Sequence, residues 1–220
     1  MKQVNEILAK AVIFDMDGVL IDSEPYYTSR FENLFRAYSK PFTAEALSRL
    51  AGASSQMEFE IVRSFWGEDI STDELKKMYR EVNSQNRPDY NKLVFPDAIT
   101  VLDRIRDAGF IMALASSSGI RTIERVLDSL GIQNYFSSIV SGEMFEQSKP
   151  HPEIYLHSME SLGLQAQDCI AIEDSTYGVR SASAAGLRVV AIRDHRFGYD
   201  QSDASWLIES LSELPALLGI

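Results

Sequence analysis

The sequence predicts an α/β fold, in which a doubly wound parallel sheet carries a helical domain inserted after its first strand. Two observations lead to this prediction. Short apolar runs alternate with amphipathic helical patterns along most of the chain, which is typical of a parallel sheet covered on both faces. The alternation stops between residues 23 and 91, where helical patterns follow one another without a strand.

The strands and helices of the core can be placed in chain order. Five strands are predicted from the apolar runs near residues 11–15, 110–115, 138–140, 168–172 and 187–192. Five helices are predicted from the amphipathic stretches near residues 97–108, 119–130, 152–162, 175–185 and 211–218. We therefore expect a Rossmann-like core domain formed by residues 1–22 and 92–220, and a helical cap domain formed by residues 23–91.

The inserted domain is predicted to contain four helices, near residues 25–39, 43–51, 55–66 and 72–86. We expect the aromatic side chains of Phe59, Phe65 and Trp66 to pack in its core. The insert leaves the core at the carboxyl edge of the sheet, where open α/β sheets bind ligands. We therefore expect it to act as a lid, with hinges near residues 20–24 and 87–96.

Composition excludes several classes of partner. The net charge of −11 argues against non-specific electrostatic binding to nucleic acid or to an anionic membrane. No apolar run approaches the ~18 residues of a membrane span, and the first residues do not resemble a signal peptide. Cys169 is the single cysteine, so no intrachain disulfide can form, and a reducing compartment such as the cytoplasm is expected. The oligomeric state cannot be predicted from these features.

Acidic side chains follow two of the predicted strands. Asp15 and Asp17 come after the first strand, and their side chains would point the same way if the backbone stayed extended. Two anions side by side repel each other unless a cation or a shared proton lies between them. Glu173 and Asp174 follow the strand near residues 168–172. Carboxylates without His or Cys clusters select a hard cation, and Mg²⁺ fits best.

Two further segments at the same predicted edge suit a phosphate group. Residues 116–119, Ser-Ser-Ser-Gly, offer hydroxyls and backbone N–H groups at a helix N-terminus. Lys149 stands just before another helix, where the flanking prolines restrict the backbone, and it can contact phosphate oxygens. One carboxylate could then act as a nucleophile and form an aspartyl-phosphate. A second carboxylate, two residues away, could transfer protons.

Four segments together resemble the motifs of the haloacid dehalogenase-like phosphatase superfamily. They are DMDGV at 15–19, ALASSS at 113–118, SKPHPEIY at 148–155 and IEDSTYGV at 172–179. The resemblance covers nearly the whole chain and is closest to the branch with a helical cap after the first motif, which includes beta-phosphoglucomutase. It implies a Mg²⁺-dependent phosphatase that hydrolyses a small phosphorylated metabolite, such as a sugar phosphate, through an aspartyl-phosphate.

The resemblance also implies a role for each acidic residue in the motifs. Asp15 corresponds to the nucleophile and is a metal ligand. Asp17 corresponds to the general acid and base, and its backbone carbonyl binds the metal. Asp174 binds Mg²⁺ with its side chain, and Glu173 binds it directly or through a water molecule.

The remaining matched residues are implied to bind the phosphoryl group. Ser116 donates a hydrogen bond to it, and the neighbouring Ser117 is expected to contribute to phosphate binding. Lys149 steadies both Asp15 and the phosphate. Gly18 is expected to allow a turn, or a close approach of the backbone, as the chain leaves the first strand.

A phosphohexomutase like beta-phosphoglucomutase is the main alternative. That reaction also uses an aspartyl-phosphate but returns the phosphoryl group to a sugar. Aligned without gaps, this chain has Tyr27 where the mutase has a cap histidine, and residues 52–56 lack an expected cap arginine. A tyrosine cannot replace histidine as a proton relay near neutral pH. Hydrolysis is therefore favoured.

Other chemistries fit the sequence less well. A dehalogenase needs neither the second aspartate nor the metal, and no feature marks Lys76 or Lys77 as the imine-forming lysine of a phosphonatase. A non-enzymatic phospho-receiver would carry its phosphorylated aspartate on the third strand, but residues 138–140 are Ser-Ile-Val. A large helical insert is also unexpected in such a switch.

Overall fold

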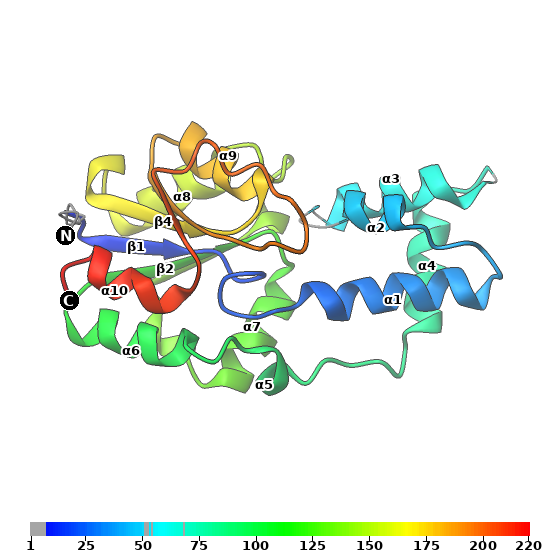
Figure 1. Cartoon of the computed structure of the whole chain (residues 1–220), viewed down its shortest axis with the longest axis horizontal. Helices are drawn as coiled ribbons and strands as arrows, with labels where there is room; N and C mark the ends of the chain where they lie inside the picture. Colours follow the sequence, from blue (N-terminus) through cyan, green and yellow to red (C-terminus); the bar gives the residue numbers. More distant parts are fainter. Residues whose placement is uncertain (1–7, 51–52, 54, 68) are drawn as a thin grey trace. The chain divides into compact units, whose positions relative to one another are not determined.

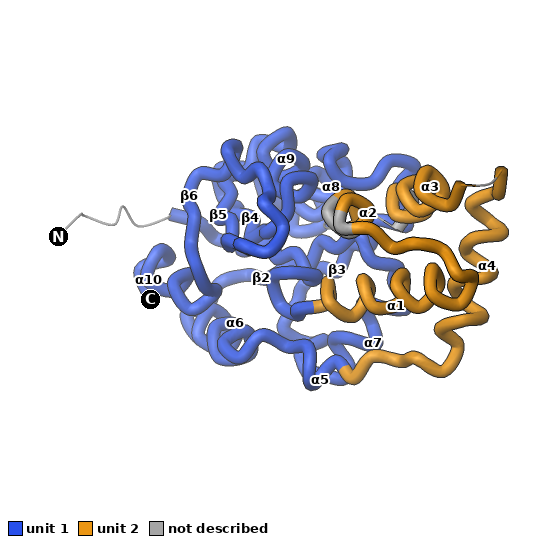
Figure 2. The backbone as a smooth tube through the Cα atoms, turned by 45° about the vertical axis from the view of Figure 1, so that its right-hand side comes forward, with its two compact units in different colours: residues 1–22, 90–220 blue, residues 23–89 orange. Residues whose placement is uncertain are grey.

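The computed structural model describes residues 8–50, 53, 55–67 and 69–220. The chain divides into two compact units, which Figure 2 distinguishes by colour. Unit 1 spans Met1–Asp22 and Tyr90–Ile220, and unit 2 spans Ser23–Asp89. Among the helices in the described part of the chain, none combines the length and apolar composition that a membrane-spanning segment needs.

Unit 1 is built on a six-stranded parallel sheet with the strand order β3-β2-β1-β4-β5-β6. Figure 1 labels three neighbouring strands of this sheet, β1, β2 and β4. The strands are β1 (Ala11–Phe14), β2 (Ile111–Ser116), β3 (Ser138–Ser141), β4 (Cys169–Glu173), β5 (Arg188–Ile192) and β6 (Trp206–Ile208). The five predicted strands are confirmed, whereas β6 was not predicted. It has only three residues, Trp-Leu-Ile, of which one is buried, so its apolar run is short and was not recognised as a strand.

Helices cover both faces of this sheet, because successive side chains of each strand enter opposite apolar layers. Val12 and Phe14 of β1 pack in the layer that includes α6, α7 and α10, whereas Ala11 and Ile13 pack in the layer that includes α8 and α9. These helices are α6 (Ala98–Asp107), α7 (Ile120–Leu130), α8 (Glu153–Leu162), α9 (Thr176–Ala184) and α10 (Leu214–Leu217), and a short α5 spans Tyr90–Leu93. The predicted doubly wound α/β fold is confirmed.

Unit 2 contains the four helices expected between the first two strands. They are α1 (Glu24–Ala37), α2 (Ala44–Leu50), α3 (Ser55–Trp66) and α4 (Thr72–Val82). Phe59 and Trp66 are buried in its apolar core, and Phe65 packs against that core, as predicted. Residues 52–56 are the segment that lacks the cap arginine of the mutase. Gly52 and Ser54 of this segment lie outside the described residues, so its conformation is not described.

The two connections to unit 2 are paired with each other inside unit 1. The N–H of Asp22 donates to the carbonyl of Leu93 (2.7 Å), and the N–H of Phe95 donates to the carbonyl of Leu20 (3.0 Å). Arg196, in the loop after β5, donates two hydrogen bonds to the carboxylate of Asp22, at 3.0 and 2.8 Å. The ordered framework of unit 1 therefore extends to the last residue before unit 2.

Candidate active site

The carboxyl ends of three adjacent strands define the site. Asp15 follows β1, Ser116 is the last residue of β2, and Glu173 is the last residue of β4. The register aligns Phe14 with Leu114 on one side and with Ile172 on the other, so these strand ends lie next to one another. Ligands of open α/β sheets bind at such an edge, where the strand order reverses.

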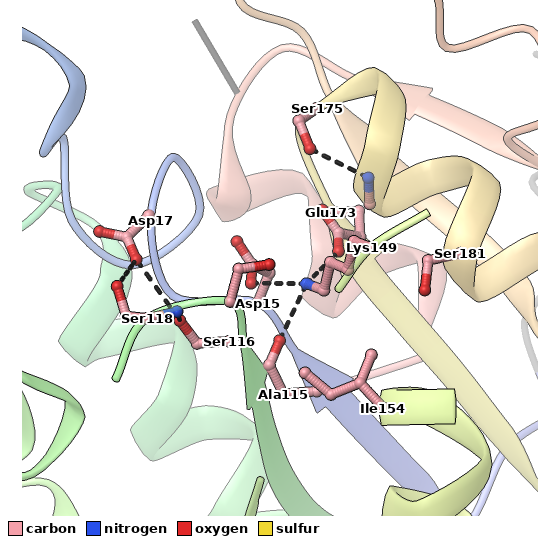
Figure 3. A network of polar contacts seen from close by, with 12 residues as sticks. Asp15, Asp17, Ala115, Ser116, Ser118, Lys149, Ile154, Glu173, Ser175 and Ser181 are labelled. Atoms are coloured by element: carbon pink, nitrogen blue, oxygen red, sulfur yellow. Dashed lines mark hydrogen bonds and ion pairs between the residues drawn. The ribbon is translucent and has the colours of Figure 1, made fainter. Parts of the chain in front are cut away.

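Lys149 lies at the centre of the site, in the loop before α8. Its ammonium donates to Asp15 Oδ1 (2.8 Å), to Glu173 Oε1 (2.7 Å) and to the carbonyl of Ala115 (3.0 Å), as Figure 3 shows. The side chains of Lys149, Asp15 and Glu173 are only 5%, 10% and 0% exposed. Three acceptors match the three protons of the ammonium, so the buried charge is fully hydrogen-bonded.

Burial and neighbouring charges together set the pKa values of Lys149 and Asp15. Burial alone would lower the pKa of Lys149, but the charges of Asp15 and Glu173 outweigh it and hold that pKa above its ordinary value. Burial raises the pKa of Asp15 to about 8, against the opposing effect of the Lys149 ammonium. The neighbouring carboxylates of Glu173 and Asp17 raise it further. The Lys149 ammonium alone therefore does not offset the burial of Asp15 and the charges of its acidic neighbours.

The acidic residues at this edge form a compact cluster. Asp15, Glu173 and Asp174 are buried, and each offers a carboxylate oxygen within 4.8 Å of those of the other two. Gly18 has a φ of 80°, and a Cβ built there would lie 2.0 Å from Asp174 Oδ2, so only glycine fits beside this carboxylate. Three carboxylates against one lysine, with oxygen donors alone, suit a hard divalent cation such as Mg²⁺.

Asp17 has partners different from those of Asp15. Strand β1 ends at Phe14, and the backbone then turns, with the N–H groups of Leu20 and Ile21 both donating to the carbonyl of Met16 (2.8 and 3.1 Å). The alternation of an extended strand therefore no longer applies at Asp17. Its Oδ2 accepts hydrogen bonds from Ser118 Oγ (2.9 Å) and from Ser116 Oγ (3.4 Å), as Figure 3 shows.

The serine loop after β2 is held by hydrogen bonds within the loop and to neighbouring segments. The N–H of Ser118 donates to Oγ of the buried Ser116 (3.0 Å), and Ser148 Oγ donates to Ser117 Oγ (3.5 Å). At the start of α7, the N–H of Ile120 donates to Glu143 Oε2 (3.1 Å). A carboxylate of the protein thus already pairs with one of the N-terminal amides that the sequence suggested for an anion.

Three residues of the site were not singled out by the sequence. Ser118 bonds to Asp17, the hydroxyl of Tyr155 donates to Glu173 Oε1, and a Cβ at Gly178 would lie 1.9 Å from Glu173 Oε2. Burial, followed by the charge of Glu173, raises the pKa of Tyr155 well above its ordinary value, so its hydroxyl remains a donor. A glycine inside a helix, such as Gly178 in α9, lowers helix stability by about 1 kcal/mol relative to alanine. Its presence in the sequence was therefore the available signal that another group packs closely against the helix at this position.

Comparison with known proteins gives consistent matches. Residues 12–192 match the family described as haloacid dehalogenase-like hydrolase. A phosphorylated carbohydrates phosphatase of Thermotoga maritima is 31% identical over 180 residues, which cover 81% of this chain and 82% of that protein. A beta-phosphoglucomutase of Bacillus subtilis is 29% identical over 191 residues, covering 83% of each chain.

Solved structures agree with this grouping. The crystal structure of a beta-phosphoglucomutase from Clostridium difficile superposes with a TM-score of 0.79 at 25% identity, covering 94% of this chain and 93% of that one. These matches confirm the resemblance drawn from the four motifs, including its beta-phosphoglucomutase-like branch. They also confirm, at the level of the family, the predicted enzyme class of phosphoric monoester hydrolases.

Proposed function

Because the chain belongs to the haloacid dehalogenase-like hydrolases, we propose that it is a Mg²⁺-dependent phosphatase that acts through a phosphoryl group carried on Asp15. Its substrate is a small phosphomonoester, and a sugar phosphate agrees with the name of the Thermotoga maritima relative. The observation that carries the proposal is the buried ammonium of Lys149, which bridges Asp15 and Glu173 at the carboxyl edge of the sheet.

The first half of the proposed reaction transfers the phosphoryl group to the enzyme. The carboxylate of Asp15 attacks phosphorus, and the bond from phosphorus to the leaving oxygen breaks. Asp17, held by Ser118, gives its proton to that oxygen as the alcohol departs. The ammonium of Lys149 keeps the attacking carboxylate in place and offsets the charge that gathers in the site.

The second half returns the enzyme to its starting state. Asp17 takes a proton from a water molecule, the water oxygen bonds to phosphorus, and the bond to Asp15 breaks to release inorganic phosphate.

Asp15, Glu173 and Asp174 would hold Mg²⁺, together with the backbone carbonyl of Asp17. When bound, Mg²⁺ supplies positive charge next to the phosphoryl oxygens. We assign the role of a lid to the helical insert, residues 23–91, from its place in the chain after β1.

A phosphohexomutase is the second candidate, because relatives named beta-phosphoglucomutase match most of the chain. In that reaction the phosphoryl group would pass from Asp15 to a sugar hydroxyl instead of to water. The residue in α1 at the place of the mutase's cap histidine is Tyr27, whose hydroxyl does not exchange protons readily near neutral pH. This difference favours hydrolysis.

A metabolite panel scored for phosphate release tests the proposal and separates the two candidates. We expect Mg²⁺-dependent release of phosphate from at least one sugar phosphate, silenced by EDTA and restored by added Mg²⁺. Interconversion of glucose 1-phosphate and glucose 6-phosphate is followed in parallel. Isomerisation without phosphate release would establish the mutase instead. An Asp15→Asn variant that retained turnover would refute the assignment of Asp15.

A further inference from the structure

Tyr155, on the first turn of α8, lies directly against the acidic cluster. Its side chain is fully buried, and its hydroxyl donates to Glu173 Oε1. The same oxygen accepts a hydrogen bond from the Lys149 ammonium at 2.7 Å, and that ammonium lies 5.1 Å from the centre of the Tyr155 ring. One residue therefore contacts both the carboxylate and its cationic partner.

The other oxygen of the same carboxylate is also confined. Glu173 Oε2 accepts a hydrogen bond from the N–H of Asp174 at 3.2 Å. The backbone at Gly178 approaches so closely that a Cβ there would lie 1.9 Å from Oε2. Rotation of the carboxylate about its last bond would break the bond to Tyr155 on one side and meet the α9 backbone on the other.

We propose that Tyr155 is a positioning residue, whose hydroxyl fixes the Glu173 carboxylate and thereby sets the cation affinity of the cluster formed by Asp15, Glu173 and Asp174. A tyrosine suits this task because its hydroxyl sits on a rigid ring that packing holds in place. Groups that hydrogen-bond to metal-binding carboxylates typically change metal affinity about 10- to 100-fold when removed. The consequence for turnover rests on the proposed function, whereas the consequence for cation binding does not.

The variant Tyr155→Phe removes the hydroxyl but keeps the ring and its packing against Lys149. In calorimetric titration of the resting enzyme with Mg²⁺, without substrate, we expect Kd to rise about 10- to 100-fold. At subsaturating Mg²⁺ we expect kcat to fall while KM for the phosphate ester stays unchanged, and at saturating Mg²⁺ we expect kcat to approach the wild-type value. The matched control is Tyr135→Phe, which removes a hydroxyl bonded to the carboxylate of Asp103 (2.8 Å) outside the site and should leave both quantities unaltered. Wild-type Mg²⁺ affinity in Tyr155→Phe overturns the proposal.

A double-mutant comparison tests whether Tyr155 acts through Glu173. In a Glu173→Ala background, which leaves no side-chain oxygen for the Tyr155 hydroxyl to fix, we expect Tyr155→Phe to change Mg²⁺ affinity by much less than it does in the wild type. Equal fold-changes in the two backgrounds overturn the proposal. If Tyr155→Phe does not fold, 3-fluorotyrosine placed at position 155 alone provides the second measurement. Its ¹⁹F resonance should shift on addition of Mg²⁺, and an unchanged resonance overturns the proposal.

The two proposals fail in distinguishable ways. A wild-type protein that binds Mg²⁺ but releases no phosphate from any ester refutes the proposed function, and the titrations still decide the role of Tyr155. An active Mg²⁺-dependent phosphatase whose Tyr155→Phe variant binds Mg²⁺ with unaltered affinity refutes the role of Tyr155 alone.

Discussion

Replacing Lys149 by methionine removes the only ammonium found among the three buried carboxylates of the described site. The change breaks the bonds to Asp15, Glu173 and the carbonyl of Ala115, at 2.8, 2.7 and 3.0 Å, while keeping most of the apolar stem. Removing one partner of a buried ion pair costs about 3–5 kcal/mol, because the opposite charge is left buried without compensation. For a chain of 220 residues, this corresponds to a fall in Tm of about 6–20 °C.

Urea unfolding followed by circular dichroism, in EDTA at neutral pH, measures this loss. The control is Lys10→Met, since Lys10 pairs with Asp168 at 2.9 Å but its side chain is 67% exposed. Such a surface pair contributes less than about 1 kcal/mol. We also expect added Mg²⁺ to raise the unfolding midpoint of Lys149→Met more than that of the wild type, because a cation compensates the charge of the buried carboxylates that the substitution leaves unpaired. Equal destabilisation by the two substitutions would refute the reasoning.

Three further predictions follow from individual contacts. Gly178→Ala should lower kcat about 10- to 100-fold, because the new methyl group displaces the Glu173 carboxylate, and unchanged kinetics would contradict the contact. Asp17→Asn should lower kcat by about 10² to 10⁴ with the fold preserved, and a smaller loss would contradict its role in proton transfer. Burial alone would raise the pKa of Asp194, but hydrogen bonds from Arg196 outweigh it and lower that pKa below 3.8. A lowered pKa stabilises the folded state above the unfolded value, so Asp194→Asn should cost less than about 1 kcal/mol at pH 7. Urea unfolding measures the difference in free energy of unfolding between the wild type and Asp194→Asn. This difference should shrink as the pH falls below 3.8 and vanish below the lowered pKa of Asp194, and a difference that persists would contradict the pairing with Arg196.

The sequence predicted the sheet edge where these groups meet, because parallel strands bring their carboxyl ends together whatever lies between them in the chain. Asp15 and Glu173, separated by nearly the whole core, could therefore be placed together from the apolar runs that precede them. Lys149 could be placed at the same sheet edge because it lies in a loop just before a predicted helix. The positions of these residues depend on the strand topology, which the alternation of apolar runs and amphipathic helices in the sequence indicates.

The contacts inside the site could not be predicted in the same way. The turn at Met16 ends the two-residue alternation, so the hydrogen bond from Ser118 to Asp17 depends on a loop conformation that no pattern encodes. Tyr155 occupies a buried face of α8 and has the periodicity of an ordinary core residue. Strand β6 is a run of only three apolar residues, which is too short to predict a strand, and its pairing with β5 defines it.

A search for a phosphoryl group on Asp15 tests the proposed function most directly. A substrate labelled with ³²P, identified from the metabolite panel, is mixed with enzyme and Mg²⁺, and the reaction is quenched within the first turnover. We expect one labelled peptide, which contains Asp15 and is absent from the Asp15→Asn variant. Label on any other residue, or steady turnover by a wild-type enzyme that never carries label, would contradict the proposed function.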